Sequence, residues 1–149
     1  MSKTRILLAA LAAVSATPLF AHTPQDDAVE YRQGLMTVIG WNFGPLGAMV
    51  KGKVAFDAAA FTLHAERIAY LSDQVVEGFP SGSDKGAHTD AKAALWANFD
   101  DFKDKAKAFN TEAKALAEVA KEKDEAKDKA QFKKVAAACK ACHEKYKND

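Results

Sequence analysis

The chemistry of this sequence is concentrated in five residues near its C-terminus, Cys139-Lys140-Ala141-Cys142-His143. Two thiols three residues apart and an imidazole directly after them form the C-x-x-C-H pattern of covalent c-type haem attachment. The thiols add across the two vinyl groups of one porphyrin, and the adjacent imidazole ligates the iron. On a helix these three side chains lie within one turn and on one side. The pattern predicts one haem c, bound through Cys139 and Cys142, with His143 as the axial iron ligand.

Other uses of a cysteine pair at this spacing fit the sequence less well. A disulfide across one helical turn is possible in an oxidising compartment, and two thiols could simply fill a core. A thioredoxin-type redox pair expects a β-α-β setting, which the sequence does not predict. A zinc site would have three ligands here, and no second pair at ligand spacing supplies the rest.

Length and charge limit what the rest of the chain can be. With 149 residues there is room for one domain, or at most two, and 48% hydrophobic with 28% charged residues excludes wholesale disorder. The chain has 21 basic and 20 acidic residues, so no basic excess attracts nucleic acid.

The first 21 residues have the order of a secretory signal peptide. Lys3 and Arg5 precede an apolar run over residues 6–14, and small residues then lead to Ala21. The run is too short to span a bilayer, although an uncleaved anchor is the alternative. We expect residues 1–21 to be removed, which leaves residues 22–149 as a periplasmic domain without membrane insertion.

Apolar residues recur in steps of three and four along the mature chain, which predicts four amphipathic helices. The first three expected helices run from Thr23-Pro24 to about Gly52, from about Asp57 to Gly78, and from Leu95 to Ala120. The charged segment 121–128 holds the last turn, and the fourth helix follows it. Pro45 should kink or interrupt the first helix. Phe56, Leu63 and Tyr70 form the seven-residue repeat of the second. The fold class is therefore all-α, an antiparallel four-helix bundle, with an open pair of helical hairpins as the alternative.

The first expected helix carries residues that suit a buried haem. Arg32 shares a stripe with Ile39 and Leu46, and a guanidinium facing a core needs an anionic partner. A haem propionate matches its forked geometry, and Gln33 can add a hydrogen bond. Alternatively, Arg32 extends to water at the open end. Met36 lies one turn further on the same face, either as a sixth iron ligand or as core material.

Three segments of the sequence match a known family. They are Tyr31-Arg32-Gln33-Gly34-Leu35-Met36, Asp90 six residues before Trp96, and the ending from Cys139 to Lys147. In these segments the sequence resembles cytochrome c′, the class II bacterial cytochromes c, and the resemblance covers the whole mature chain. The position of C-x-x-C-H at the C-terminus, together with the Arg-Gln pair, makes the match specific.

The resemblance implies a fold, a site and partners. It implies a four-helix bundle that is often a homodimer through its first two helices. Arg32, Gln33 and Asp90 would lie around the haem and its propionates, with Lys147 near His143. Met36 falls at the distal position. Typical members are five-coordinate and high-spin, carry electrons, and bind NO or CO; low-spin relatives use a methionine from this segment as sixth ligand.

The leading hypothesis is a periplasmic haem protein that exchanges electrons with an unidentified redox partner or binds NO, and that is not an enzyme. The first alternative is a six-coordinate, low-spin electron carrier with Met36 as axial ligand. A peroxidase-like enzyme would need a polar distal pocket, whereas Leu35, Ile39 and Phe43 surround Met36. A helical bundle without haem is the remaining alternative. His22, His64 and His88 are interpreted as ordinary surface histidines.

Overall fold

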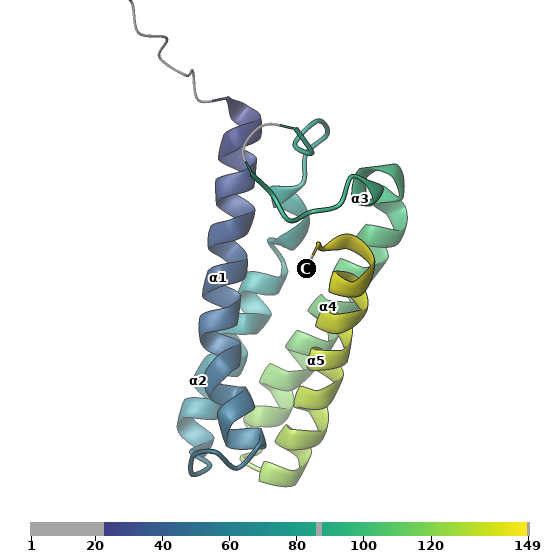
Figure 1. Ribbon diagram of the computed structural model, residues 1–149. Coiled ribbons are helices and arrows are strands. Elements are labelled where there is room, and N and C mark those ends of the chain that lie inside the picture. The colour runs from purple at the N-terminus through teal and green to yellow at the C-terminus, as the bar shows by residue number, and fades with distance from the viewer. Residues whose placement is uncertain (1–22, 86–87, 149) are drawn as a thin grey trace, which may run out of the picture.

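The computed structural model describes residues 23–85 and 88–148, and these form an antiparallel bundle of four long helices (Figure 1). The long helices are α1 (Pro24–Val50), α2 (Ala58–Ser72), α4 (Phe99–Ala120) and α5 (Glu125–Tyr146). A 3₁₀ turn, η1 (Val75–Gly78), follows α2, and a short helix, α3 (Ala94–Ala97), precedes α4. The described part of the chain contains no strand, so the predicted all-α fold is confirmed. The expected signal peptide lies outside the described residues.

Local sequence explains where the helices begin. Thr23 and Asp26 form a reciprocal capping box at the start of α1. The Asp57 carboxylate accepts from two backbone N–H groups at the start of α2, and Asp124 does the same for α5. The last interhelix turn therefore lies within 121–128, as expected, and α5 starts at Glu125.

The first and third predicted helices differ from the sequence prediction in their continuity. α1 continues without interruption through Pro45. Pro45 removes the donor that would reach the carbonyl of Trp41, and because Trp41 is 77% exposed, water can replace that donor. The third predicted helix is broken at Asn98, whose side-chain amide donates to the Ala94 carbonyl in competition with the backbone.

The core lies where the patterns of the third and fourth helices predicted, but α2 presents another face. Phe61, Ala65 and Ile68 of α2 are buried, whereas Leu63 and Tyr70 of the expected repeat are 46% and 73% exposed. α2 also ends at Ser72 rather than at Gly78. The seven-residue repeat therefore marks an apolar outer stripe of α2 and not its core face.

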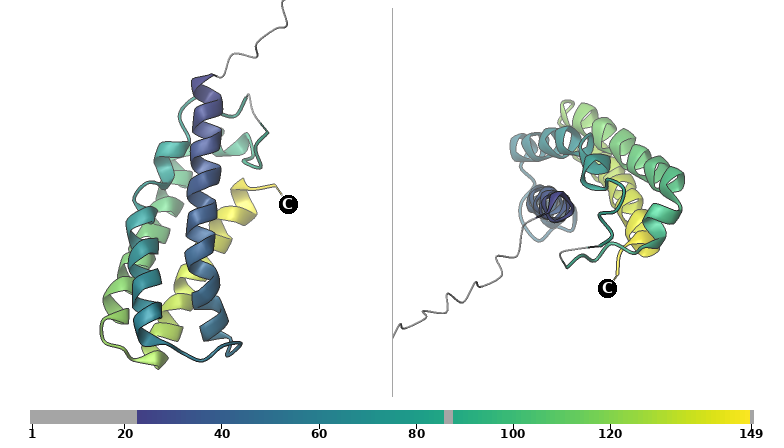
Figure 2. Two further views of the ribbon diagram at one scale, coloured as in Figure 1. Left: turned by 90° about the vertical axis from the view of Figure 1, so that its left-hand side faces the viewer. Right: turned by 90° about the horizontal axis from the view of Figure 1, so that it is seen from above.

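The candidate site lies toward the end of the bundle at which α1 begins and α5 ends (Figure 1). The α1–α2 and α4–α5 connections lie at the opposite end, and the C-terminus of α5 lies beside the segment that leads into α3 (Figures 1 and 2). None of the helices in the described residues is sufficiently long and apolar to cross a membrane.

Asp128, in the first turns of α5, is fully buried, and neither carboxylate oxygen has a hydrogen-bond partner in the described structure. Burial, and then the charges of Asp124 and Glu122, raise the pKa of Asp128. An ionised Asp128 therefore destabilises the folded state at pH values above the ordinary aspartate pKa of about 4.

We expect Asp128→Asn to increase the free energy of unfolding by about 1 kcal/mol at pH 7, because the amide carries no charge to desolvate. The gain should shrink as the pH falls toward 4, where the aspartate of the folded wild type takes up its proton. Urea denaturation at the two pH values measures this. Asp104→Asn, at an exposed position of α4, is the control. Equal stability of Asp128→Asn and wild type at pH 7 would contradict the expectation.

Candidate functional site

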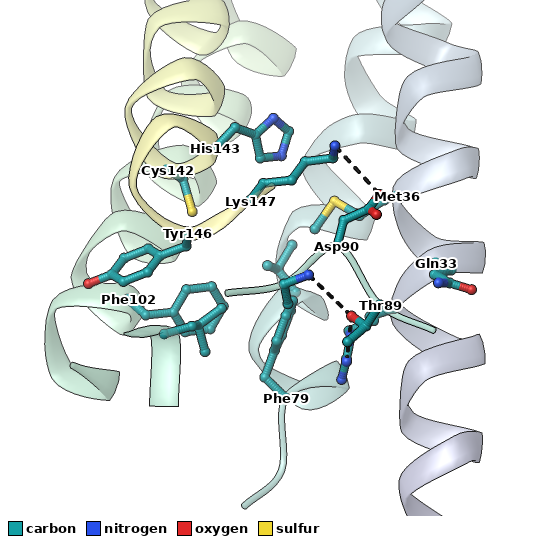
Figure 3. A pocket seen from close by; sticks show the side chains of 14 residues that line it. Gln33, Met36, Phe79, Thr89, Asp90, Phe102, Cys142, His143, Tyr146 and Lys147 are labelled. Carbon is teal, nitrogen blue, oxygen red and sulfur yellow. Dashed lines mark hydrogen bonds and ion pairs between the residues drawn. The ribbon is translucent and has the colours of Figure 1, made fainter. Parts of the chain in front are cut away.

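The C-x-x-C-H residues lie on the last turns of α5, and the helix continues past them to Tyr146. Cys139 and Cys142 are half-buried free thiols that pack against the hydrophobic core. His143 projects from α5 into the space between α5 and α1, and Met36 projects from α1 toward the same space (Figure 3). The motif therefore faces a cleft and not bulk solvent alone.

The cleft between α1 and α5 consists of two adjoining hollows of about 660 and 830 Å³, both partly open to solvent. Both hollows are lined by Met36, Val75, Cys142 and His143. The first adds Arg32, Gln33, Phe79, Thr89, Asp90, Ala91, Leu95, Phe102, Tyr146 and Lys147. The second adds Ile39, Gly40, Phe43, Lys105, Ala106, Phe109, Ala138 and Cys139. The cleft thus has the mostly apolar lining of a cofactor site.

Electrostatics keep the motif neutral. Burial, and then the neighbouring Cys142, raise the pKa of the Cys139 thiol to about 11. Burial also raises the pKa of Cys142, and burial together with Lys147 lowers the pKa of His143. Neutral thiols do not fit a redox pair, which relies on a thiolate of lowered pKa, while a neutral imidazole is the form that ligates a metal.

Arg32 is 3% exposed and lies on the wall of the cleft. Its guanidinium donates to the carbonyl oxygens of Gly78 and Ser83 at 3.0 and 2.9 Å, and to the Ser83 and Thr89 hydroxyls at 3.0 and 2.8 Å. The rings of Phe79 and Trp96 lie 5.1 and 5.4 Å from its central carbon. Arg32 therefore does not extend to water. Within the described residues it makes no ion pair with a carboxylate.

Gly78 permits the close packing that forms this cage. A Cβ atom at residue 78 would lie 2.6 Å from the Cβ of Arg32 and 3.2 Å from its Cα. These atoms belong to the stem of Arg32 and to the α1 backbone, so they cannot move aside easily. A glycine at the end of η1 thus lets the Gly78 carbonyl reach the Arg32 guanidinium.

The remaining predicted residues also line the cleft. Gln33 Nε2 donates to the His88 carbonyl at 2.9 Å. The Asp90 carboxylate lies 3.5 Å from Lys147 Nζ, and Asn148 N donates to the Asp90 carbonyl at 2.7 Å. The segment before α3 is therefore tied to the end of α5 beside His143. The structure brings all seven predicted site residues to one cleft.

The other histidines lie elsewhere or outside the described residues. His64 is on α2, with Nδ1 3.0 Å from Asn42 Oδ1, and it is partly buried rather than an ordinary surface residue. His88 is exposed, and its carbonyl accepts from Gln33. His22 lies outside the described residues.

Sequence reasoning missed the residues that surround Arg32, namely Gly78, Phe79, Ser83, Thr89 and Trp96. Their sequence signal is weak, because the segment 79–89 reads only as a turn-rich loop. The expectation that a haem propionate also partners Arg32 stays a prediction. Neutral carbonyl and hydroxyl oxygens satisfy its terminal N–H groups.

The donor set fits a covalently attached haem. Two thiols and one imidazole from a single helix border the cleft, a methionine faces them, and a buried cation lacking a carboxylate partner lies on the wall. No cluster of three or more His, Cys, Asp or Glu side chains that could hold a metal ion occurs in residues 23–85 and 88–148. The described part of the chain therefore does not support the zinc alternative.

The chain is similar to several known proteins along most of its length. The family model described as Cytochrome C′ matches residues 27–147. A cytochrome c′ from Halomonas halodenitrificans is 33% identical over 127 residues, covering 82% of this chain and 96% of that protein. A solved cytochrome c prime from Shewanella frigidimarina is 46% identical, with a TM-score of 0.81 and coverage of 84% and 97% of the two chains. A nitric oxide complex of a cytochrome c prime mutant from Alcaligenes xylosoxidans is 34% identical, with a TM-score of 0.76 and coverage of 84% and 97%.

Proposed function

The chain belongs to the cytochrome c′ family of haem proteins, and on that premise we propose that it is a periplasmic haem c protein that transfers electrons or binds NO or CO at a five-coordinate iron. The observation that carries the proposal is the placement of Cys139, Cys142 and His143 along one cleft. The bound haem would supply a redox-active iron with a site for a small gas. It is not proposed to be an enzyme.

Individual residues have distinct roles in this proposal. The sulfurs of Cys139 and Cys142 would hold the porphyrin, and the neutral imidazole of His143 would ligate the iron. Arg32 provides a buried positive charge on the cleft wall, and Gln33 provides an amide beside it. Asp90 pairs with Lys147 and keeps the segment before α3 against the last turn of α5.

The wall of α1 that faces the motif supports gas binding rather than peroxidase chemistry. Met36, Ile39 and Phe43 line the cleft from α1. None of these three α1 side chains can accept or deliver a proton, as a peroxidase distal residue must. The nitric oxide complex of the Alcaligenes xylosoxidans relative supports NO as a ligand.

Met36 decides between the proposed five-coordinate site and the low-spin alternative. It lines both hollows, so its sulfur can approach a haem held by α5. We expect Met36→Ala to leave the absorption spectrum of the reduced protein unchanged, with a broad high-spin Soret band and a response to CO. Met36→Leu is the size-matched companion, since it removes the sulfur and keeps the bulk. Sharp low-spin bands that disappear in both variants would instead assign Met36 as the sixth ligand.

The signal-peptide pattern supports export to the periplasm. Residues 1–21 have the charged, apolar and small-residue order that a signal peptidase recognises. N-terminal sequencing of the protein from the periplasmic fraction should begin at His22. A cytoplasmic protein that keeps Met1 would contradict this part of the proposal.

Apolar side chains on α1 and α2 support a homodimer. Val38 and Trp41 of α1 are 46% and 77% exposed, and Leu63 and Tyr70 of α2 are 46% and 73% exposed. Val38, Leu63 and Tyr70 border one shallow hollow on this face. Such a patch suits association with another copy of the chain.

We expect Trp41→Lys to weaken self-association at least tenfold, because it places a charge on this face in place of a large apolar ring. Sedimentation velocity over a concentration series measures the effect. Val54→Lys, at an exposed position after α1, is the control and should leave association unchanged. A monomeric wild type would contradict the dimer.

A further inference from the structure

The terminal amino groups of Arg32 are already fully engaged. They carry four N–H bonds, and the structure gives them four acceptors: the carbonyls of Gly78 and Ser83 and the hydroxyls of Ser83 and Thr89. The four terminal N–H bonds of the guanidinium therefore point at Gly78, Ser83 and Thr89, and only the Nε–H is left for a further acceptor.

Thr89 is a polar residue that both contacts Arg32 and lines the cleft. Its Oγ1 accepts from Arg32 Nη2 at 2.8 Å and from Ala91 N at 3.2 Å. A hydroxyl has two lone pairs and one proton, so both acceptor positions are used. The proton must donate elsewhere, and no acceptor for it lies in the described part of the chain. Thr89 lines the first hollow of the cleft (Figure 3).

The other hydroxyl beside Arg32 cannot serve the same purpose. Ser83 Oγ accepts from Arg32 and donates its own proton to the Pro80 carbonyl at 2.9 Å. Ser83 is also fully buried, and it is not among the residues that line the cleft. Of the two hydroxyls, only that of Thr89 has a free proton and a place on the cleft wall.

We propose that Thr89 is a haem-binding residue whose hydroxyl donates to a carboxylate of the haem, with Arg32 acting through it as a positioning residue. This assignment rests on the proposed function. A cation bound to Oγ1 polarises the O–H bond and makes it a stronger donor, and the preferred acceptor of such a donor is an anionic oxygen. The Arg32 charge thus acts on the cleft through Thr89 as well as from its own place on the wall.

The test measures the midpoint reduction potential of the haem-loaded protein in matched variants. Thr89→Val removes the hydroxyl and keeps the branched shape, and Thr89→Ala is a second variant without the hydroxyl in case valine prevents folding. Thr89→Ser restores the hydroxyl alone. Thr111→Val, at an exposed position of α4, is the control. Each protein is first examined by denaturing mass spectrometry for covalent haem.

We expect the potential to fall in Thr89→Val and Thr89→Ala, because a carboxylate that loses its donor retains more negative charge and favours the ferric iron. Thr89→Ser and Thr111→Val should match wild type. An unchanged potential in the hydroxyl-free variants, or an equal fall in Thr89→Ser, would overturn the role of Thr89 while the haem stays in place. A wild-type protein without covalent haem would overturn the proposed function and this assignment together.

Discussion

Replacing both cysteines, as Cys139→Ala with Cys142→Ala, should abolish covalent haem attachment completely. The thioether bonds require the two sulfurs, and the full sequence contains no other cysteine. Haem that entered the cleft of this variant would be held by His143 and apolar contacts alone, and it would leave the polypeptide on denaturation. Haem staining after denaturing electrophoresis measures the loss.

The two single replacements provide intermediate cases for comparison with the double variant. Cys139→Ala and Cys142→Ala each leave one sulfur on the cleft wall, so each should retain part of the covalently bound haem. Ala141→Ser, at the exposed position between the cysteines, is the matched control and should stain like wild type. Full staining of the double variant would show that the attachment does not use these thiols.

Replacing Arg32 by glutamine should lower the free energy of unfolding by about 3 kcal/mol. Four hydrogen bonds and two ring contacts converge on the buried guanidinium, and glutamine can replace at most part of them. The Gly78 and Ser83 carbonyls then lose their donors inside the protein, and each unsatisfied buried polar group costs about 1–3 kcal/mol.

The effect of Arg32→Gln is measured by urea denaturation of the haem-loaded protein. Lys107→Gln on α4 is the control, because Lys107 is exposed and such surface changes stay within about 0.5 kcal/mol. If Arg32→Gln were no more destabilising than Lys107→Gln, the cage around Arg32 would contribute nothing to the fold.

The helices with the clearest repeats were predicted well, and the reason is visible in α4. Phe102, Phe109 and Leu116 are large apolar residues seven apart, and charged residues separate them, so only one face could be buried. α2 misled the prediction because it has two apolar stripes. A repeat identifies a stripe but not what covers it, and the stripe with Leu63 and Tyr70 remains outside the core.

The candidate site was predictable where its chemistry is contiguous in sequence. Cys139, Cys142 and His143 occupy one helical turn, so their spacing alone specified the site. The surroundings of Arg32 could not be found in this way, since its acceptors are 46 to 57 residues away and lie in η1 and the loop after it. Which backbone atoms a loop turns toward a buried cation depends on tertiary packing. The close approach of Gly78 to Arg32, which leaves no room for a Cβ atom at residue 78, illustrates this.

The proposed function requires one porphyrin that is joined covalently to the last helix and enclosed by the bundle. Denaturing mass spectrometry of the exported protein, made in a cell with active cytochrome c maturation, can detect this bond. We expect a polypeptide that begins at His22 and carries the added mass of one haem. A bare polypeptide of the same length, colourless before denaturation, would contradict it.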